Sequence, residues 1–286
     1  MDPLITTLRS APNLAALYGR AVLTGLTRRG GGELPDTGYR LAGVTVDRAH
    51  LADYDRVCGL RHCDELPPTY PQILSFPLQV KLMTDPGFPF PLVGSVHLAN
   101  RITWTRPLHA GERLDIRVRV ADLRPHPKGR QFDMITEVCT GDEPVCTAVS
   151  TYLRRGAGSG DGGDARPEPG PAPEPTAVWR VPADTGRRYA EVSGDRNPIH
   201  LHPLTARPFG FRRAIAHGMW TKARCLAAFE GRLPDAGTIE VRFKLPVLLP
   251  ATVGFTARPT GSGHAFQVFD ARTGRPHLAG ELSRLP

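Results

Sequence analysis

Alternating apolar and polar residues fill two stretches of the chain, and each stretch follows an apolar segment with helical spacing. Period-two alternation is typical of strands with one buried face. In the first half it predicts strands at residues 99–106, 112–122, 131–140 and 144–154. In the second half it predicts strands at residues 238–245, 251–258, 264–270 and 277–284. The longer helices are expected at residues 70–84 and 214–230. A helix followed by a strand meander is an α+β pattern, in which the helix covers one face of an antiparallel sheet.

The two halves of the chain also share short segments of sequence. Residues 54–60 resemble residues 189–195, and both carry the pattern Tyr-x-x-Val-x-Gly on a short expected helix. Residues 101–108 resemble residues 240–247 at a similar offset. Similar segments in the same order and at similar spacing indicate an internal duplication.

Two segments lie outside the duplicated halves. Residues 1–40 begin with apolar positions at roughly helical spacing, which predicts an N-terminal helical extension. Residues 156–176 are dominated by Gly and Pro and contain no large apolar residue, so we expect a linker there. The linker divides the chain into a first domain at 41–155 and a second domain at 177–286.

The composition is that of a globular protein, with 40% hydrophobic residues in a chain of 286. No apolar run approaches the roughly 20 residues of a membrane helix, and we expect no signal peptide. Five cysteines, an odd number, do not indicate a disulfide framework, so a cytoplasmic location is expected. Cys58 and Cys63 lie close to His62 and Asp64 in the sequence, but these residues lack a second cysteine pair, and no metal is expected.

The formal net charge is +8, and arginine supplies nearly all of the positive charge. A basic surface can attract nucleic acid, anionic lipid or a phosphate-bearing cofactor. The arginines are dispersed and are not concentrated with aromatic residues on one helix, so nucleic-acid binding is not expected. A phosphate-bearing thioester carrier would suit the excess charge, and so would a genome biased towards arginine.

The densest group of turn-forming and ionisable residues follows the second short helix. Its turn formers, which must end that helix, are Ser193, Gly194, Asp195, Asn197 and Pro198. Pro198 stiffens the path between Asp195 and His200, and an irregular loop can turn both side chains towards one point. A carboxylate and an imidazole placed in this way can hold a single water molecule between them.

Gly218 is expected in the first turn of the second long helix. The amides of that turn lack intrahelical acceptors, the helix dipole adds partial positive charge, and glycine permits close approach. These are the components of an oxyanion site for a thioester carbonyl. Ordinary structural roles also exist for these residues, as a turn residue for Asp195 or Asn197 and as a core or surface histidine for His200. For His217 we expect packing or support of the site instead of a direct chemical role.

The motif that runs from Ser193 to His200, followed by Ile215-Ala216-His217-Gly218-Met219, resembles the hydratase 2 motif of the MaoC-like, (R)-specific enoyl-CoA hydratase family. The whole chain is similar to two-domain actinobacterial 3-hydroxyacyl-thioester dehydratases. The resemblance implies a double hotdog fold, with two long helices that are each wrapped by an antiparallel sheet. It also implies a hydro-lyase of fatty acid metabolism that needs no metal or redox cofactor.

The resemblance assigns roles to individual residues. Asp195 and His200 match the catalytic pair of the family, and Gly218 matches the residue whose amide polarises the thioester carbonyl. Asn197 matches a position that supports the loop and the catalytic water, and Ser193 fits the motif without an assigned role. The implied reaction is reversible conversion of trans-2-enoyl-CoA or enoyl-ACP (the acyl-carrier-protein thioester) to the (R)-3-hydroxyacyl thioester.

The first half departs from this motif. Leu60 stands opposite Asp195, and Glu65 stands opposite His200. We therefore expect a degenerate, non-catalytic hotdog at 41–155, a catalytic one at 177–286, and a chain that is a pseudo-dimeric monomer or a homodimer. The alternatives are a hotdog-class acyl-CoA thioesterase and a non-catalytic subunit that binds acyl thioesters. The sequence leaves open the carrier, CoA or acyl carrier protein, as well as the chain length and the pathway.

Overall fold

The structure, a computed structural model, describes residues 3–25, 32–92, 94–156 and 173–285. The chain divides into two compact units that are not contiguous in sequence. Unit 1 comprises Met1–Asp47, Asp64–Asn100 and Leu108–Gly162. Unit 2 comprises Arg48–Cys63, Arg101–Pro107 and Gly163–Pro286. Most of the predicted linker, residues 157–172, lies outside the described residues.

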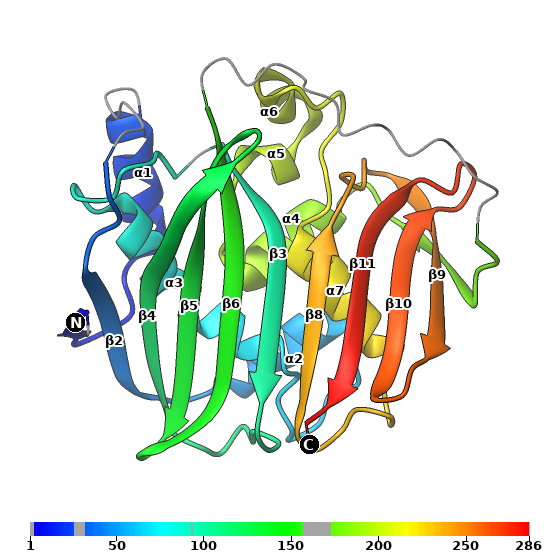
Figure 1. Ribbon diagram of the computed structural model, residues 1–286, viewed down its shortest axis with the longest axis horizontal. Helices are drawn as coiled ribbons and strands as arrows, with labels where there is room; N and C mark the ends of the chain where they lie inside the picture. Colours follow the sequence, from blue (N-terminus) through cyan, green and yellow to red (C-terminus); the bar gives the residue numbers. More distant parts are fainter. Residues whose placement is uncertain (1–2, 26–31, 93, 157–172, 286) are drawn as a thin grey trace. The chain divides into compact units, whose positions relative to one another are not determined.

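Unit 1 is a sheet with a long helix on it (Figure 1). Its elements are β1 (Leu4–Leu8), α1 (Leu14–Gly25), β2 (Thr37–Val44), α3 (Tyr70–Thr84), most of β3 (Ser95–Trp104), β4 (Leu114–His126), β5 (Gly129–Thr140) and β6 (Glu143–Arg155). The strand order is β1-β2-β4-β5-β6-β3. Strands β2, β4, β5 and β6 pair antiparallel in turn, whereas β1 pairs parallel with β2. Helix α3 packs against β2, β4 and β5.

Unit 2 repeats the arrangement and adds short helices (Figure 1). Its helices are α2 (Arg48–Cys58), α4 (Thr185–Ser193), α5 (Pro198–Leu201), α6 (Pro203–Ala206), a 3-10 turn (Arg207–Phe209) and α7 (Gly218–Ala227). Its strands are β7 (Ala177–Val181), β8 (Gly237–Phe243), β9 (Ala251–Pro259), β10 (Gly263–Asp270) and β11 (Pro276–Arg284). They lie in the order β8-β11-β10-β9-β7, and the pairs are antiparallel.

Two contacts hold α7 against the sheet of unit 2. The Lys222 Nζ atom, which is fully buried, donates to the Ile239 carbonyl on β8 at 3.0 Å. Phe229, just beyond the helix, meets Phe266 of β10 edge-on, with ring centroids 5.5 Å apart. Because these two contacts fix α7 against the sheet, its first turn has a defined position in the unit.

Helix α2 comes from the first half of the sequence but packs in unit 2. The Trp220 indole N–H on α7 donates to the Val57 carbonyl at 3.0 Å. His50 lies with its Nε2 atom 2.9 Å from the Val192 carbonyl at the end of α4. The compact unit formed by the second half of the sequence therefore includes a helix that lies outside the range 177–286.

The α+β prediction is confirmed, and the helix predicted at 70–84 coincides with α3. The helical extension predicted at 1–40 is wrong for Leu4–Leu8, which form strand β1. β-branched Ile5, Thr6 and Thr7 favour a strand, and β2 supplies the pairing partner. The helix predicted at 214–230 begins only at Gly218, because the preceding amides of Ile215 and Ala216 donate to distant carbonyls instead. Among the described residues, no helix is long and apolar enough to cross a membrane.

Candidate active site

The loop after α4 begins with a left-handed residue. Gly194 adopts φ 72° at the C-cap of α4, and its amide donates to the Ala190 carbonyl at 3.0 Å. A positive φ is accessible to glycine without the steric cost that a Cβ atom would bring. The next amide, that of Asp195, donates to the Ser193 hydroxyl oxygen at 3.1 Å. Ser193 and Gly194 thus turn the chain away from α4 at Asp195. The Asp195 side chain is 29% exposed.

Asn197 closes the loop and starts α5. The Asp195 Oδ1 atom accepts the Asn197 amide at 3.1 Å, which is an Asx turn. Asn197 is the N-cap of α5, where its side chain faces the Ile199 amide, and Pro198 occupies the first turn. The backbone hydrogen bonds therefore show that Asn197 is a turn residue. The turn brings His200 back towards Asp195.

The tautomer of His200 follows from its hydrogen bond. The His200 Nδ1 atom lies 2.8 Å from the Ile215 carbonyl, which can only accept, so Nδ1 carries the proton and Nε2 is an acceptor. The side chain is buried, with 8% of the residue exposed. Burial lowers the pKa of His200, and the Asp195 carboxylate and the Ile215 carbonyl offset only part of this. The imidazole is therefore neutral at pH 7 and offers a lone pair.

A glycine that the sequence analysis did not single out holds this arrangement. A Cβ atom on Gly186, in α4, would lie 2.0 Å from the His200 carbonyl oxygen. The backbone of α5 therefore rests directly on α4 at this point, and no larger residue fits. An isolated glycine inside a helical segment was the available signal, since it weakens the helix unless packing requires it.

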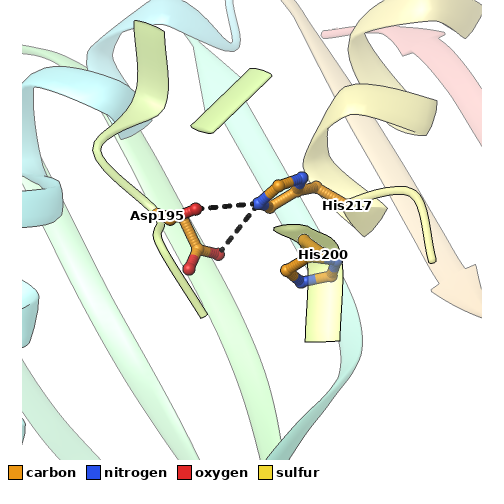
Figure 2. Close-up of side chains that lie close together, drawn as sticks. All are labelled: Asp195, His200 and His217. Carbon is orange, nitrogen blue, oxygen red and sulfur yellow. Dashed lines mark hydrogen bonds and ion pairs between the residues drawn. The ribbon is translucent and has the colours of Figure 1, made fainter. Parts of the chain in front are cut away.

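His217 completes the group, and Figure 2 shows its ring above that of His200. The two ring centroids are 3.6 Å apart with an interplanar angle of 24°. The His217 Nε2 atom donates to the Asp195 carbonyl at 3.0 Å and lies 3.8 Å from the Asp195 carboxylate. Burial, aided by repulsion from His200, lowers the pKa of His217 to about 3. Its Nδ1 atom is buried and has no hydrogen-bond partner among the described residues.

Gly218 is the first residue of α7, as expected. Its N-cap is His217, whose side chain makes no capping bond, so the first-turn amides are not satisfied by that side chain. A Cβ atom on Gly218 would lie 2.8 Å from the Phe243 ring. Packing against Phe243 is thus a sufficient reason for glycine here.

Asp195, His200 and His217 offer ligand atoms that all lie within 4.8 Å of one another, a spacing that also suits a metal ion. A metal binds in the plane of an imidazole ring, and two stacked rings direct their lone pairs along nearly parallel planes. In addition, one nitrogen of each ring is already bonded to a carbonyl. The geometry therefore favours a small hydrogen-bonding molecule such as water over a tetrahedral metal ion.

The sequence and the fold match known proteins. A family model described as MaoC like domain matches residues 165–280. A relative with 39% identity over 255 residues covers 88% of this chain, and the match covers 91% of that relative. The chain belongs to the MaoC-like dehydratase family. The relative is 3-hydroxyacyl-thioester dehydratase X of Mycobacterium tuberculosis.

Solved structures agree with this assignment. The crystal structure of HtdX of Mycobacterium tuberculosis aligns with a TM-score of 0.78 at 38% identity, over 87% of this chain and 100% of that one. A second Mycobacterium tuberculosis protein, described as having a double hotdog fold, aligns with a TM-score of 0.51 at 15% identity, over 85% of this chain and 93% of that one. The latter likeness concerns the fold alone. The double hotdog prediction is confirmed.

Proposed function

We propose that the chain catalyses reversible hydration of acyl thioesters, from trans-2-enoyl-CoA or enoyl-ACP to the (R)-3-hydroxyacyl thioester. The observation that carries the proposal is the convergence of the Asp195 carboxylate and the neutral His200 ring near the first turn of α7. The printed activity of the relative, a 3-hydroxyacyl-thioester dehydratase, supports the same reaction.

In the proposed mechanism, the Gly218 amide donates a hydrogen bond to the thioester carbonyl. This stabilises the enolate-like charge that develops when a proton joins or leaves C2. The dipole of α7 adds to the stabilisation because its positive end faces the same point. Asn197 and Ser193 act through the loop backbone, since they place Asp195 and His200.

Water is held by the two acceptors, Asp195 and the His200 Nε2 atom. Each accepts a hydrogen bond from one of the two O–H groups of the water, which leaves an oxygen lone pair directed at C3. As the oxygen attacks C3, one proton passes to the acid–base pair, and the pair delivers a proton to C2. Dehydration is the reverse. The chemistry requires the neutral form of His200, which its buried position favours.

Substitution of the pair tests this proposal. Asp195→Asn and His200→Ala are each expected to lower the hydration rate by about 10²–10⁴ while the circular dichroism spectrum is unchanged. The matched controls are Asp235→Asn and His109→Ala, which remove the same groups from exposed positions. A rate near that of the wild type in either site variant would refute the assignment.

The product distinguishes the proposed reaction from the alternatives. Hydration of enoyl-CoAs of graded chain length should yield the (R)-3-hydroxy product without free thiol. Release of free CoA would instead favour a thioesterase, and binding without turnover would favour a non-catalytic subunit. Light scattering would decide between the proposed pseudo-dimeric monomer and a homodimer. A cytoplasmic location is also proposed, because all five cysteines are free thiols, as a reducing compartment maintains them.

A further inference from the structure

A hollow lies within unit 2, and its wall is rich in arginine. Its volume is about 190 Å³. Arg56 at the end of α2, Arg188 on α4 and Arg224 on α7 line it, together with Thr185 and Trp220. No carboxylate is among the lining residues of this hollow, which we call the arginine pocket.

Contacts of α7 with the end of α2 and with β7 hold part of the wall in place. Trp220 is anchored through its indole N–H to the Val57 carbonyl, which is itself part of the lining. The Arg224 guanidinium lies over the Trp179 ring, 4.7 Å from its centroid. On another side it meets Gly59, where an added Cβ atom would lie 3.2 Å from Nη1. Arg224 is therefore positioned before any ligand arrives, which lowers the entropic cost of binding.

The other two guanidinium groups are available to a ligand. Arg56 forms an ion pair with Asp53 in the same helix, but both side chains are more than half exposed. Exposed pairs of this kind contribute little, so exchange of Asp53 for an anion costs little. Arg188 is exposed and makes no ion pair with any residue that the structure describes. Three positive groups thus face one hollow that no carboxylate lines, and only Arg56 has an acidic partner, the exposed Asp53.

Planar guanidinium groups match the oxygens of phosphate with paired hydrogen bonds. Two helices of the pocket have ends that adjoin the proposed catalytic group, since Asp195 follows α4 and His217 precedes α7. Arg224 lies less than two turns after Gly218. That separation is about 9 Å along the helix axis, which a pantetheine arm can cover. We propose that the arginine pocket binds a phosphate group on the carrier arm of the thioester substrate. This inference rests on the proposed function.

Two sources share this chemistry: the phosphates of CoA and the phosphodiester that links pantetheine to a carrier protein. The test uses the double variant Arg56→Gln/Arg188→Gln, since Arg224 is packed too closely to replace cleanly. The control is Arg258→Gln/Arg272→Gln, which removes two exposed charges elsewhere in unit 2. Hydration is measured with one acyl group on three carriers: CoA, a pantetheinylated carrier protein and N-acetylcysteamine, which has no phosphate.

We expect the pocket variant to raise KM about tenfold for a phosphate-bearing substrate, with kcat unchanged. The KM for the N-acetylcysteamine thioester should not change, and the control should change neither value. A rise with CoA alone assigns the pocket to the nucleotide phosphates, and a rise with the carrier protein assigns it to the phosphodiester. An equal rise for N-acetylcysteamine, an equal effect of the control, or no rise at all would overturn the proposal.

Direct binding separates this inference from the proposed function. Titration calorimetry with inorganic pyrophosphate should detect binding to the wild type and to His200→Ala, but loss of binding in the pocket variant. If no thioester is hydrated, this result still supports the pocket while the function fails. Equal pyrophosphate binding by the wild type and the pocket variant would contradict the pocket, whatever the activity.

Discussion

Gly186→Ala tests whether the contact between α4 and α5 positions His200. The alanine Cβ atom would lie 2.0 Å from the His200 carbonyl oxygen. Real Cβ atoms essentially never approach another heavy atom more closely than 3.0 Å. The obstacle is backbone, so a side-chain rotation cannot relieve it. The segment that carries His200 must therefore move by at least about 1 Å, which typically costs about 10²-fold in rate.

The effect of Gly186→Ala on stability should be much smaller than its effect on rate. Overpacking costs about 1–3 kcal/mol, and alanine returns up to about 1 kcal/mol of helix propensity. A net loss of about 1 kcal/mol lowers the melting temperature by about 2–4 °C in a protein of this size.

The assay follows loss of the conjugated enoyl absorbance, together with thermal unfolding of the same samples. The control is Gly261→Ala, because a Cβ atom at Gly261 meets no other atom within 4 Å. We expect kcat to fall about 100-fold in the first variant and to be unchanged in the second. A Gly186→Ala enzyme with the kcat of the wild type would show that the contact does not position His200.

Three further outcomes are expected. The native pKa of His217 is about 3 and the unfolded value is about 6.5, so the native state resists protonation and stability is lost as the pH falls through this window. The free energy of unfolding in urea should therefore fall less steeply from about pH 7 to pH 5 in His217→Asn than in the wild type, by up to about 1 kcal/mol per pH unit. Equal slopes in the two proteins would contradict burial of His217 in its neutral form. Gly218→Ala should destabilise the protein by about 1–3 kcal/mol, and adding Phe243→Leu should recover part of that loss in urea unfolding, a coupling that would be absent if Phe243 were not the obstacle. Dialysis against a chelator should leave the hydration rate unchanged, whereas a loss that zinc restores would reveal a metal at the histidine pair.

The regular elements were predictable because their signal is local. Alternation over 112–122 or 264–270 shows in neighbouring residues, and the strands formed within a few residues of those bounds. Strand β1 was not predictable in the same way, because its pairing depends on Thr37–Leu41, more than thirty residues away. The start of α7 was misplaced for a similar reason, since the amide of Ile215 bonds to Ile199 across the loop.

The candidate site likewise contains residues that the sequence predicts and contacts that it does not. Asp195 and His200 were recognisable together, because turn-forming residues lie between them in a single short segment. The stacking of His217 on His200 and the fit of Gly186 against the His200 carbonyl depend on how separate helices meet. Such contacts leave only weak traces in a single sequence, such as a glycine where a helix would favour alanine.

Helix α2 gives the duplicated sequence an interlocked architecture. It is encoded in the first half, yet the ring centroid of its Tyr54 lies 6.3 Å from that of Tyr189. Its residues belong to the compact unit that contains Asp195 and His200. Severing the chain at the Gly/Pro-rich segment would strip that unit of one of its own helices. The fused halves can therefore no longer be reassorted as independent modules, and any ancestral split form would have needed to supply this helix in trans.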